Sequence, residues 1–271
     1  MNSKSIINRI KETLKDNVDD KTKINAQRFF KEQVKVYGVK TSVCSKIADQ
    51  FWSEVKILQK DEIFKLCEFF LASDYCEEAY IASSWLPRIS EQFERDDWVI
   101  FQDWMEKYIN NWAKCDTFCN HTLGDFLMRF PELIVKLKEW TFSENRWVKR
   151  AASVSLIIPA RQGYFLNDIF DICDQLLLDQ DDMVQKGYGW LLKATSEMYQ
   201  KEVFNYVQQN KAKMPRTALR YAIEKMPDEL RKEAIKRYKN EKLKTRKTRT
   251  AKKEKYVKII GNSTKKINFV E

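Results

Sequence analysis

Asp74-Tyr-Cys-Glu-Glu-Ala79 is the first of three related openings, followed by Ser143-Glu-Asn-Arg-Trp-Val148 and Gln180-Asp-Asp-Met-Val-Gln185. The first two lie about 70 positions apart, the second and third about 37 apart, and Asn110-Asn-Trp112 fills the gap between the first two. Asp or Ser near a helix start caps backbone N–H groups and suits the helix dipole. A period of about 34 to 37 residues, with two helices in each unit, is typical of an α-solenoid.

Apolar residues recur at helical spacing along most of the chain. They predict a helix over 6–14, another over 29–37 that Gly38 stops, and another over 63–71 that ends before Ser73. Six Gly and five Pro in 271 residues are too few for a sandwich or a barrel. We therefore expect an all-α fold, an α-solenoid of HEAT-like helix pairs, because ankyrin and tetratricopeptide consensus residues are absent. A generic helical bundle with chance spacing is the alternative.

The net charge of +10 is concentrated at the C-terminal end. Residues 236–271 hold 14 Lys and Arg against 3 Asp and Glu, so the rest of the chain carries a balance of −1. We expect a solenoid domain over 1–240 and a basic, disordered tail over 241–271, because the tail has too few apolar residues to bury a core. Such a tail attracts any polyanion without choosing among them.

Cysteine usage and hydropathy indicate a soluble, cytosolic protein. The six Cys sit at scattered positions with no disulfide framework, and they are expected to be buried, reduced thiols. Cys115 and Cys119 share a helix face, but one His in the whole chain leaves little basis for a metal site. No apolar run approaches the length of a membrane span, and we expect no membrane partner.

Four side chains suited to chemistry fall in register with the repeat. Trp112 and Asp116 share a face of one helix at i, i+4, and Arg150 and Trp190 follow at intervals of about one unit each. Equivalent positions of successive solenoid units line one concave surface, so these four side chains are expected to meet there. Each also has a plainer interpretation alone: core for the two Trp, a solvated or capping acid for Asp116, and an ordinary salt bridge for Arg150.

Other catalytic patterns are weak. Gly189 and its neighbours lie within a predicted helix and lack the strand and the Lys-Ser/Thr of a phosphate-binding loop. His121 has no Cys or Ser partner at a recognisable spacing, and we expect it to pack or to face solvent.

Three motifs resemble the AlkD-type DNA alkylation repair glycosylases. They are Asn111-Trp-Ala-Lys-Cys-Asp116 with the following Leu123-Gly-Asp-Phe-Leu-Met-Arg-Phe-Pro-Glu-Leu-Ile134, Glu144-Asn-Arg-Trp-Val-Lys-Arg-Ala-Ala152, and Val184-Gln-Lys-Gly-Tyr-Gly-Trp190. The resemblance runs from about residue 3 to about 235, in the same order and with nearly the same spacing. The basic tail lies outside it.

The resemblance implies a HEAT-like solenoid whose concave face holds duplex DNA. It also implies that the protein is a monomer in the cytoplasm, associated with the nucleoid. It implies removal of positively charged N3- and N7-alkylated purines by a monofunctional glycosylase, with no cofactor and no metal. Asp116 would be the catalytic carboxylate, Trp112 and Trp190 would contact the lesion's sugar–phosphate, and Arg150 would hold a phosphate. Further contacts with the DNA backbone are expected from Lys149, Lys186 and Arg216.

One position departs from the family pattern. Phe29 aligns with a Tyr of the active members, so it would contact DNA without that hydroxyl group. A non-catalytic DNA-binding homologue is therefore one alternative, and a helical protein-interaction scaffold is another. Release of N7-methylguanine from alkylated duplex DNA, compared with binding alone, separates them.

The chemistry of these residues agrees with the resemblance. A cationic alkylpurine is already a good leaving group, so the reaction needs no strong general acid and the lack of a usable His is no objection. The transition state gathers positive charge on the deoxyribose, which a carboxylate near C1′ stabilises while it orients the attacking water. Tryptophan faces add cation–π attraction to the same charge.

Overall fold

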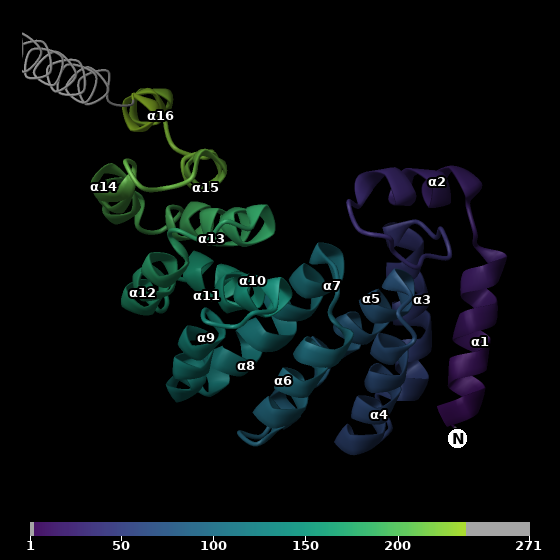
Figure 1. Ribbon diagram of the computed structural model, residues 1–271. Coiled ribbons are helices and arrows are strands. Elements are labelled where there is room, and N and C mark those ends of the chain that lie inside the picture. The colour runs from purple at the N-terminus through teal and green to yellow at the C-terminus, as the bar shows by residue number, and fades with distance from the viewer. Residues whose placement is uncertain (1–2, 237–271) are drawn as a thin grey trace, which may run out of the picture.

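The computed structural model describes residues 3–236, and the predicted basic tail at 241–271 lies outside the described residues. Figure 1 shows the helices following one another around an arc, from α1 at one end to α16 at the other. Within residues 3–236 there is no β-strand, and one isolated bridge joins Lys35 to Tyr75. The expected all-α, solenoid-like fold is confirmed.

The helices of the first half are α1 (Ser3–Asp16), α2 (Asp20–Phe29), α3 (Thr41–Val55), α4 (Lys60–Ala72), α5 (Cys76–Trp85), the 3₁₀ helix η1 (Leu86–Gln92), α6 (Asp97–Tyr108) and α7 (Trp112–Thr117). Those of the second half are the π-helix η2 (Phe118–Leu123), α8 (Gly124–Arg129), the 3₁₀ helix η3 (Pro131–Leu133), α9 (Ile134–Trp140), α10 (Arg146–Val154), α11 (Ile157–Arg161), α12 (Leu166–Leu176), α13 (Asp182–Thr195), α14 (Gln200–Asn210), α15 (Arg216–Ala222) and α16 (Asp228–Ile235).

One helix of each unit begins at a nearly constant interval. These helices are α3, α5, α7, α10, α13 and α15, whose first residues are 34 to 36 positions apart. Each of them packs against the next in the series. Equivalent residues of successive units therefore lie side by side, which is the arrangement that the repeat predicted.

The polar openings act as helix caps in three of the four predicted places. The side-chain oxygens of Asn111, Asn145 and Asp181 accept hydrogen bonds from backbone N–H groups at the starts of α7, α10 and α13. Each cap satisfies N–H groups that have no partner inside the helix. At α5 the cap is Tyr75 and makes no side-chain bond, while Asp74, at φ 69°, forms an ion pair with Lys114 instead.

A single hydrophobic core runs along the arc between the helices. Its largest side chains with almost no exposure include Trp85, Trp104 and Tyr188. None of the helices within residues 3–236 is long and apolar enough to cross a membrane.

The helix predicted over 29–37 does not form. Helix α2 lies earlier in the chain and ends at Phe29, where the predicted helix begins, so that prediction is wrong. The backbone N–H groups of Tyr37, Gly38 and Val39 donate to the carboxylate of Glu77 on α5, at 2.8 to 3.1 Å. Because a buried carboxylate of the next unit takes these donors, the segment stays extended rather than helical.

Helix α2 is loosely attached to the rest of the arc. None of its residues is buried. Gly38, at φ 99°, passes so close beneath it that a Cβ there would lie 2.5 Å from Lys23 Cβ, which explains why glycine occupies this position. Helix α13 is packed differently, because its buried residues run along most of its length.

Candidate active site on the inner face of the arc

Asp116 on α7 and Arg150 on α10 form a two-point ion pair. Arg150 Nε donates to Asp116 Oδ1 and Arg150 Nη2 donates to Asp116 Oδ2, both at 2.8 Å. The Arg150 side chain is 6% exposed and that of Asp116 is 14% exposed. A fork of this kind fixes the position and the plane of the carboxylate.

Helix α13 completes the surroundings of Arg150. Its third nitrogen, Nη1, donates to the carbonyl of Met183 at 2.6 Å, so every guanidinium nitrogen has a protein partner. Gly187 permits this close approach, because a Cβ there would lie 2.8 Å from Ser153 Oγ and 3.3 Å from Arg150 Cγ. A phosphate contact of Arg150 would require the guanidinium to leave one of these partners, and that contact stays a prediction.

Burial and ion pairing act in opposite directions on the two charges. Burial raises the pKa of Asp116 above the ordinary Asp value, although the hydrogen bonds and charge of Arg150 work to lower it. Burial alone would lower the pKa of Arg150, but the hydrogen bonds and charge of Asp116 raise it. The result is a carboxylate that the guanidinium holds in a fixed position, in a place that water reaches poorly.

An aromatic group surrounds Trp112, one helical turn before Asp116. The ring of Phe30 stacks on Trp112 with centroids 5.3 Å apart, and the ring of Phe29 meets it edge-on at 5.4 Å. Phe29 is 70% exposed and is therefore available to a ligand. Phe30 was not among the predicted site residues, and its place beside Phe29 is the one signal in the sequence that points to it.

The other predicted side chains have partners or surroundings of their own. Trp190 is half-buried on α13 and packs against the core. Lys149 pairs with Asp179 at 2.6 Å and Lys186 pairs with Asp182 at 3.2 Å. Arg216 begins α15, and its Nη1 is buried without a hydrogen-bond partner.

The structure therefore joins the predicted residues into two contacting pairs. Asp116 binds Arg150, and Phe29 touches Trp112. Helix α7 carries one member of each pair, so the carboxylate and the aromatic face are held on a single rigid element.

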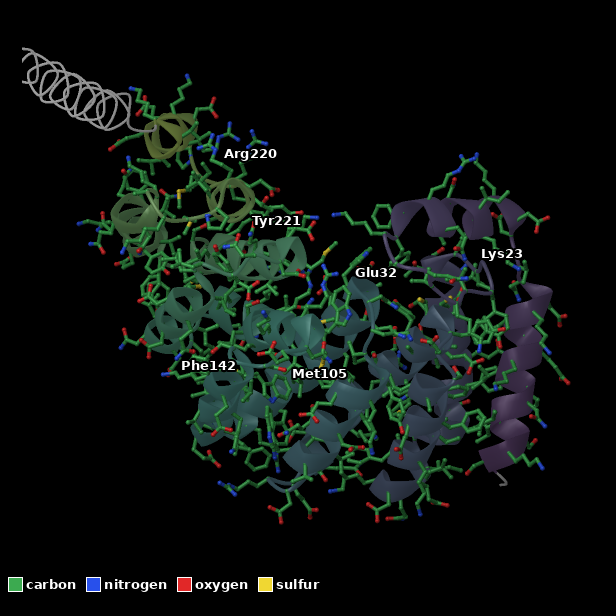
Figure 2. All side chains as sticks on the ribbon, in the orientation of Figure 1. Lys23, Glu32, Met105, Phe142, Arg220 and Tyr221 are labelled. Atoms are coloured by element: carbon green, nitrogen blue, oxygen red, sulfur yellow. The ribbon has the colours of Figure 1, made fainter. Side chains whose placement is uncertain are left out.

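Ion pairs also cross the inner face from the segment after α2. Lys31 Nζ lies 2.7 Å from Asp182 Oδ2 at the start of α13. Glu32 Oε1 lies 3.3 Å from Arg146 Nη1 at the start of α10. Figure 2 labels Glu32, whose side chain lies between the α2 segment and these helices. Because the partners are 114 and 151 residues apart, no local pattern could have predicted them.

A cavity of about 440 Å³ lies between α2 and the helices below it. Its lining is mainly apolar and includes Ala26, Phe29, Phe30, Val39, Tyr80 and Trp112. Asp116 does not line it, so the cavity borders the aromatic group rather than the ion pair.

Thiols and metal-binding side chains do not form a second centre here. All six Cys are free and five of them are buried, with Cys76 partly exposed. Burial raises the pKa of the Cys67 and Cys173 thiols, which keeps them protonated and unreactive. Within the part of the chain that the structure describes, no group of three or more His, Cys, Asp or Glu could hold a metal ion.

The arrangement is suited to a ligand that is or becomes positively charged. A carboxylate fixed by Arg150 supplies a preorganised negative charge, which is worth more in a site shielded from water than in bulk solvent. The face of Trp112 attracts cations through its ring quadrupole.

Comparison with known proteins agrees with the motifs. A family model described as "DNA alkylation repair enzyme" matches residues 10–226. A solved structure, "Predicted DNA alkylation repair enzyme from Enterococcus faecalis", superposes with a TM-score of 0.70 at 14% identity, over 78% of this chain and 98% of that one. At that identity the likeness shows the fold. No curated protein matches the chain.

Proposed function

The chain belongs to the DNA alkylation repair enzyme family, and from this premise we propose that it is a DNA glycosylase acting on duplex DNA. Its substrates are purines that carry a positive charge after alkylation at N3 or N7. The reaction is hydrolysis of the N-glycosidic bond, without a lyase step, by a single copy of the chain. No metal or organic cofactor takes part.

The buried ion pair of Asp116 and Arg150 is the observation that carries this proposal. Breaking the glycosidic bond develops positive charge on the deoxyribose, around C1′ and the ring oxygen. A carboxylate already fixed in position stabilises that charge without reorganising during the reaction. Asp116 also accepts a hydrogen bond from the attacking water and holds it on the side opposite the leaving base.

Arg150 acts in this scheme as a positioning residue. Its bonds to both carboxylate oxygens keep Asp116 ionised and hold its plane, and its bond to the Met183 carbonyl ties the pair to α13. An ionised carboxylate with a raised pKa is a better hydrogen-bond acceptor than an exposed one, so burial and pairing together prepare Asp116 for its role.

The aromatic group and the cations bind the DNA around the lesion. Trp112 and Phe29 pack against the sugar–phosphate beside Asp116, and Trp190 extends the same surface on α13. Lys149 lies on α10, Lys186 lies on α13 and Arg216 begins α15, along the inner helices where phosphates of a bound duplex would pass. These contacts fix the position of the DNA without reading its sequence.

Binding without catalysis is the second candidate, and the residue at position 29 favours it. Phe29 offers a ring to the DNA but no hydroxyl group, in contrast to the Tyr of the active members. Under this alternative the cations and aromatic residues remain functional, while the Asp116–Arg150 pair serves only to hold α7, α10 and α13 together.

A release assay separates the two candidates. The full chain is incubated in excess over duplex DNA treated with a methylating agent, and free N7-methylguanine is measured alongside retention of the duplex. We expect release above the rate of spontaneous depurination. Retention of the duplex with release at the spontaneous rate would establish the binding protein instead.

A further inference from the structure

We propose that Lys31 and Arg146 bind the DNA backbone, and that in the free protein Glu32 and Asp182 occupy them in place of phosphates. The structure thus contains two masked phosphate sites that DNA opens by exchange of one anion for another. We take duplex DNA as the ligand from the proposed function, on which this inference rests.

The positions of these ion pairs are the first support. Lys31 pairs with Asp182 at 2.7 Å, and Arg146 Nη1 and Nη2 lie 3.3 and 3.4 Å from Glu32 and Asp182. The pairs join the segment after α2 to the starts of α10 and α13, across the inner side of the arc near α7, the helix of Asp116 (Figure 1). A duplex on that face would meet these side chains.

The pairs are also of a kind that exchanges readily. The Lys31 side chain is 66% exposed, and those of Arg146, Glu32 and Asp182 are each about one-quarter to one-third exposed. Partly exposed ion pairs contribute little to stability, because water and salt screen them. Glu32 Oε2 is buried without a hydrogen-bond partner, so the carboxylate loses little on leaving Arg146.

The helix that directly precedes Lys31 and Glu32 has few buried contacts. None of the residues of α2 is buried, and the cavity of about 440 Å³ lies beneath it. Segments with few buried contacts have low local stability and move at small cost. Lys31 can therefore turn from Asp182 to a phosphate without disturbing the Asp116–Arg150 pair.

Arg146 has one fixed edge and one exchangeable edge. Asp181 caps α13 through Met183 N and Val184 N. Its Oδ1 accepts a hydrogen bond from Arg146 Nη2 at 3.0 Å, and its Oδ2 lies 2.9 Å from Arg146 Nε. Those contacts orient the guanidinium and are retained as long as α13 is folded. Nη1, which faces Glu32, is the nitrogen left to bind a phosphate.

Two matched pairs of variants of the full chain test this inference. Glu32→Gln and Glu132→Gln each remove one carboxylate that pairs with an Arg of another unit, at 3.3 and 3.2 Å, and each adds one unit of positive charge. Lys31→Met and Lys107→Met each remove one exposed Lys that lies 2.7 Å from an Asp. Within each pair of variants the change in net charge is equal. Any difference in DNA affinity between the two variants therefore reports the position of the substituted residue, not the total charge.

The measurement is a fluorescence-anisotropy titration of an undamaged duplex at two salt concentrations. We expect Glu32→Gln to bind about two- to five-fold more tightly than Glu132→Gln, because it frees Arg146 from a carboxylate that competes with phosphate. We expect Lys31→Met to bind more weakly than Lys107→Met, with a salt dependence shallower by about one unit of slope. Thermal unfolding of all four variants should stay close to that of the parent.

Either failure overturns the inference: a Glu32→Gln protein that binds no more tightly than Glu132→Gln, or a Lys31→Met protein that matches Lys107→Met. A chain that shows both differences yet releases no alkylpurine contradicts the proposed function and supports the masked sites. A chain that releases alkylpurines but shows neither difference in DNA affinity supports the proposed function and contradicts the masked sites.

Discussion

Helices α13 and α2 face each other across the inner side of the arc, and they are packed in opposite ways (Figure 1). Helix α13 buries most of its length, and its two glycines let α10 and α15 approach closely. Helix α2 buries no residue, and partly exposed ion pairs of the segment that follows it reach the opposite side. The tightly packed side holds the carboxylate in place, and the loosely packed side presents aromatic and basic groups to the ligand.

The largest expected effect on stability is at the buried ion pair. Arg150→Met keeps the volume of the side chain but leaves Asp116 without its partner, which should cost about 3–5 kcal/mol of unfolding free energy. Lys31→Met breaks an exposed pair on the α2 side and should cost at most about 1 kcal/mol. Urea unfolding of the two variants measures both. Similar losses of unfolding free energy in the two variants would contradict the difference in packing between the α13 side and the α2 side.

A smaller effect is expected from the close approach of α13 to α15. Gly189→Ala places a Cβ 2.8 Å from the Ala218 carbonyl oxygen and from Tyr221 Cβ, and should destabilise by about 1–3 kcal/mol through overpacking. Helix propensity alone favours Ala over Gly by about 1 kcal/mol. A loss of unfolding free energy would therefore show that overpacking outweighs helix propensity at this position. Ala26→Gly on α2 serves as the comparison and should change stability only through propensity. A Gly189→Ala protein more stable than its parent would contradict the packing described here.

The pH dependence of base release should report the burial of Asp116. Burial raises its folded pKa above the ordinary Asp value. The folded state therefore binds a proton more readily than the unfolded chain does, and the cost of burying the charge is relieved as the pH falls through that raised pKa. Activity requires the ionised form, so release should decline on the acid side at a pH above the ordinary Asp value. Single-turnover rates, corrected for spontaneous depurination, test this, and a decline only at or below that value would refute it.

Much of the arc could be predicted from the sequence, because its signals are local. The caps of α7, α10 and α13 and the apolar spacing between them repeat at a constant interval, and that interval places Arg150 one unit after Asp116. A single helix turn likewise sets Trp112 beside Asp116.

The α2 region could not be predicted in the same way. The non-helical backbone of Tyr37, Gly38 and Val39 is held by the carboxylate of Glu77, which lies about 40 residues further along the chain and accepts all three backbone hydrogen bonds. The ion pairs of Lys31 and Glu32 join still more distant positions. The partners of Arg150 also depend on three-dimensional packing. The sequence left a salt bridge and a phosphate contact open, and the fold surrounds the guanidinium with Asp116 and the Met183 carbonyl.

The most direct test of the central claim compares two aspartates. Asp116→Asn keeps the shape of the side chain and removes its charge, and Asp125→Asn does the same at a half-buried Asp whose pKa is also raised by burial. In single-turnover release of N7-methylguanine, the Asp116 variant should be slower than the parent by about 100- to 1,000-fold, as expected for loss of one preorganised electrostatic group. The Asp125 variant should match the parent, and both should still bind the duplex. Release by Asp116→Asn at the parent rate would contradict the assignment of Asp116 as the catalytic carboxylate.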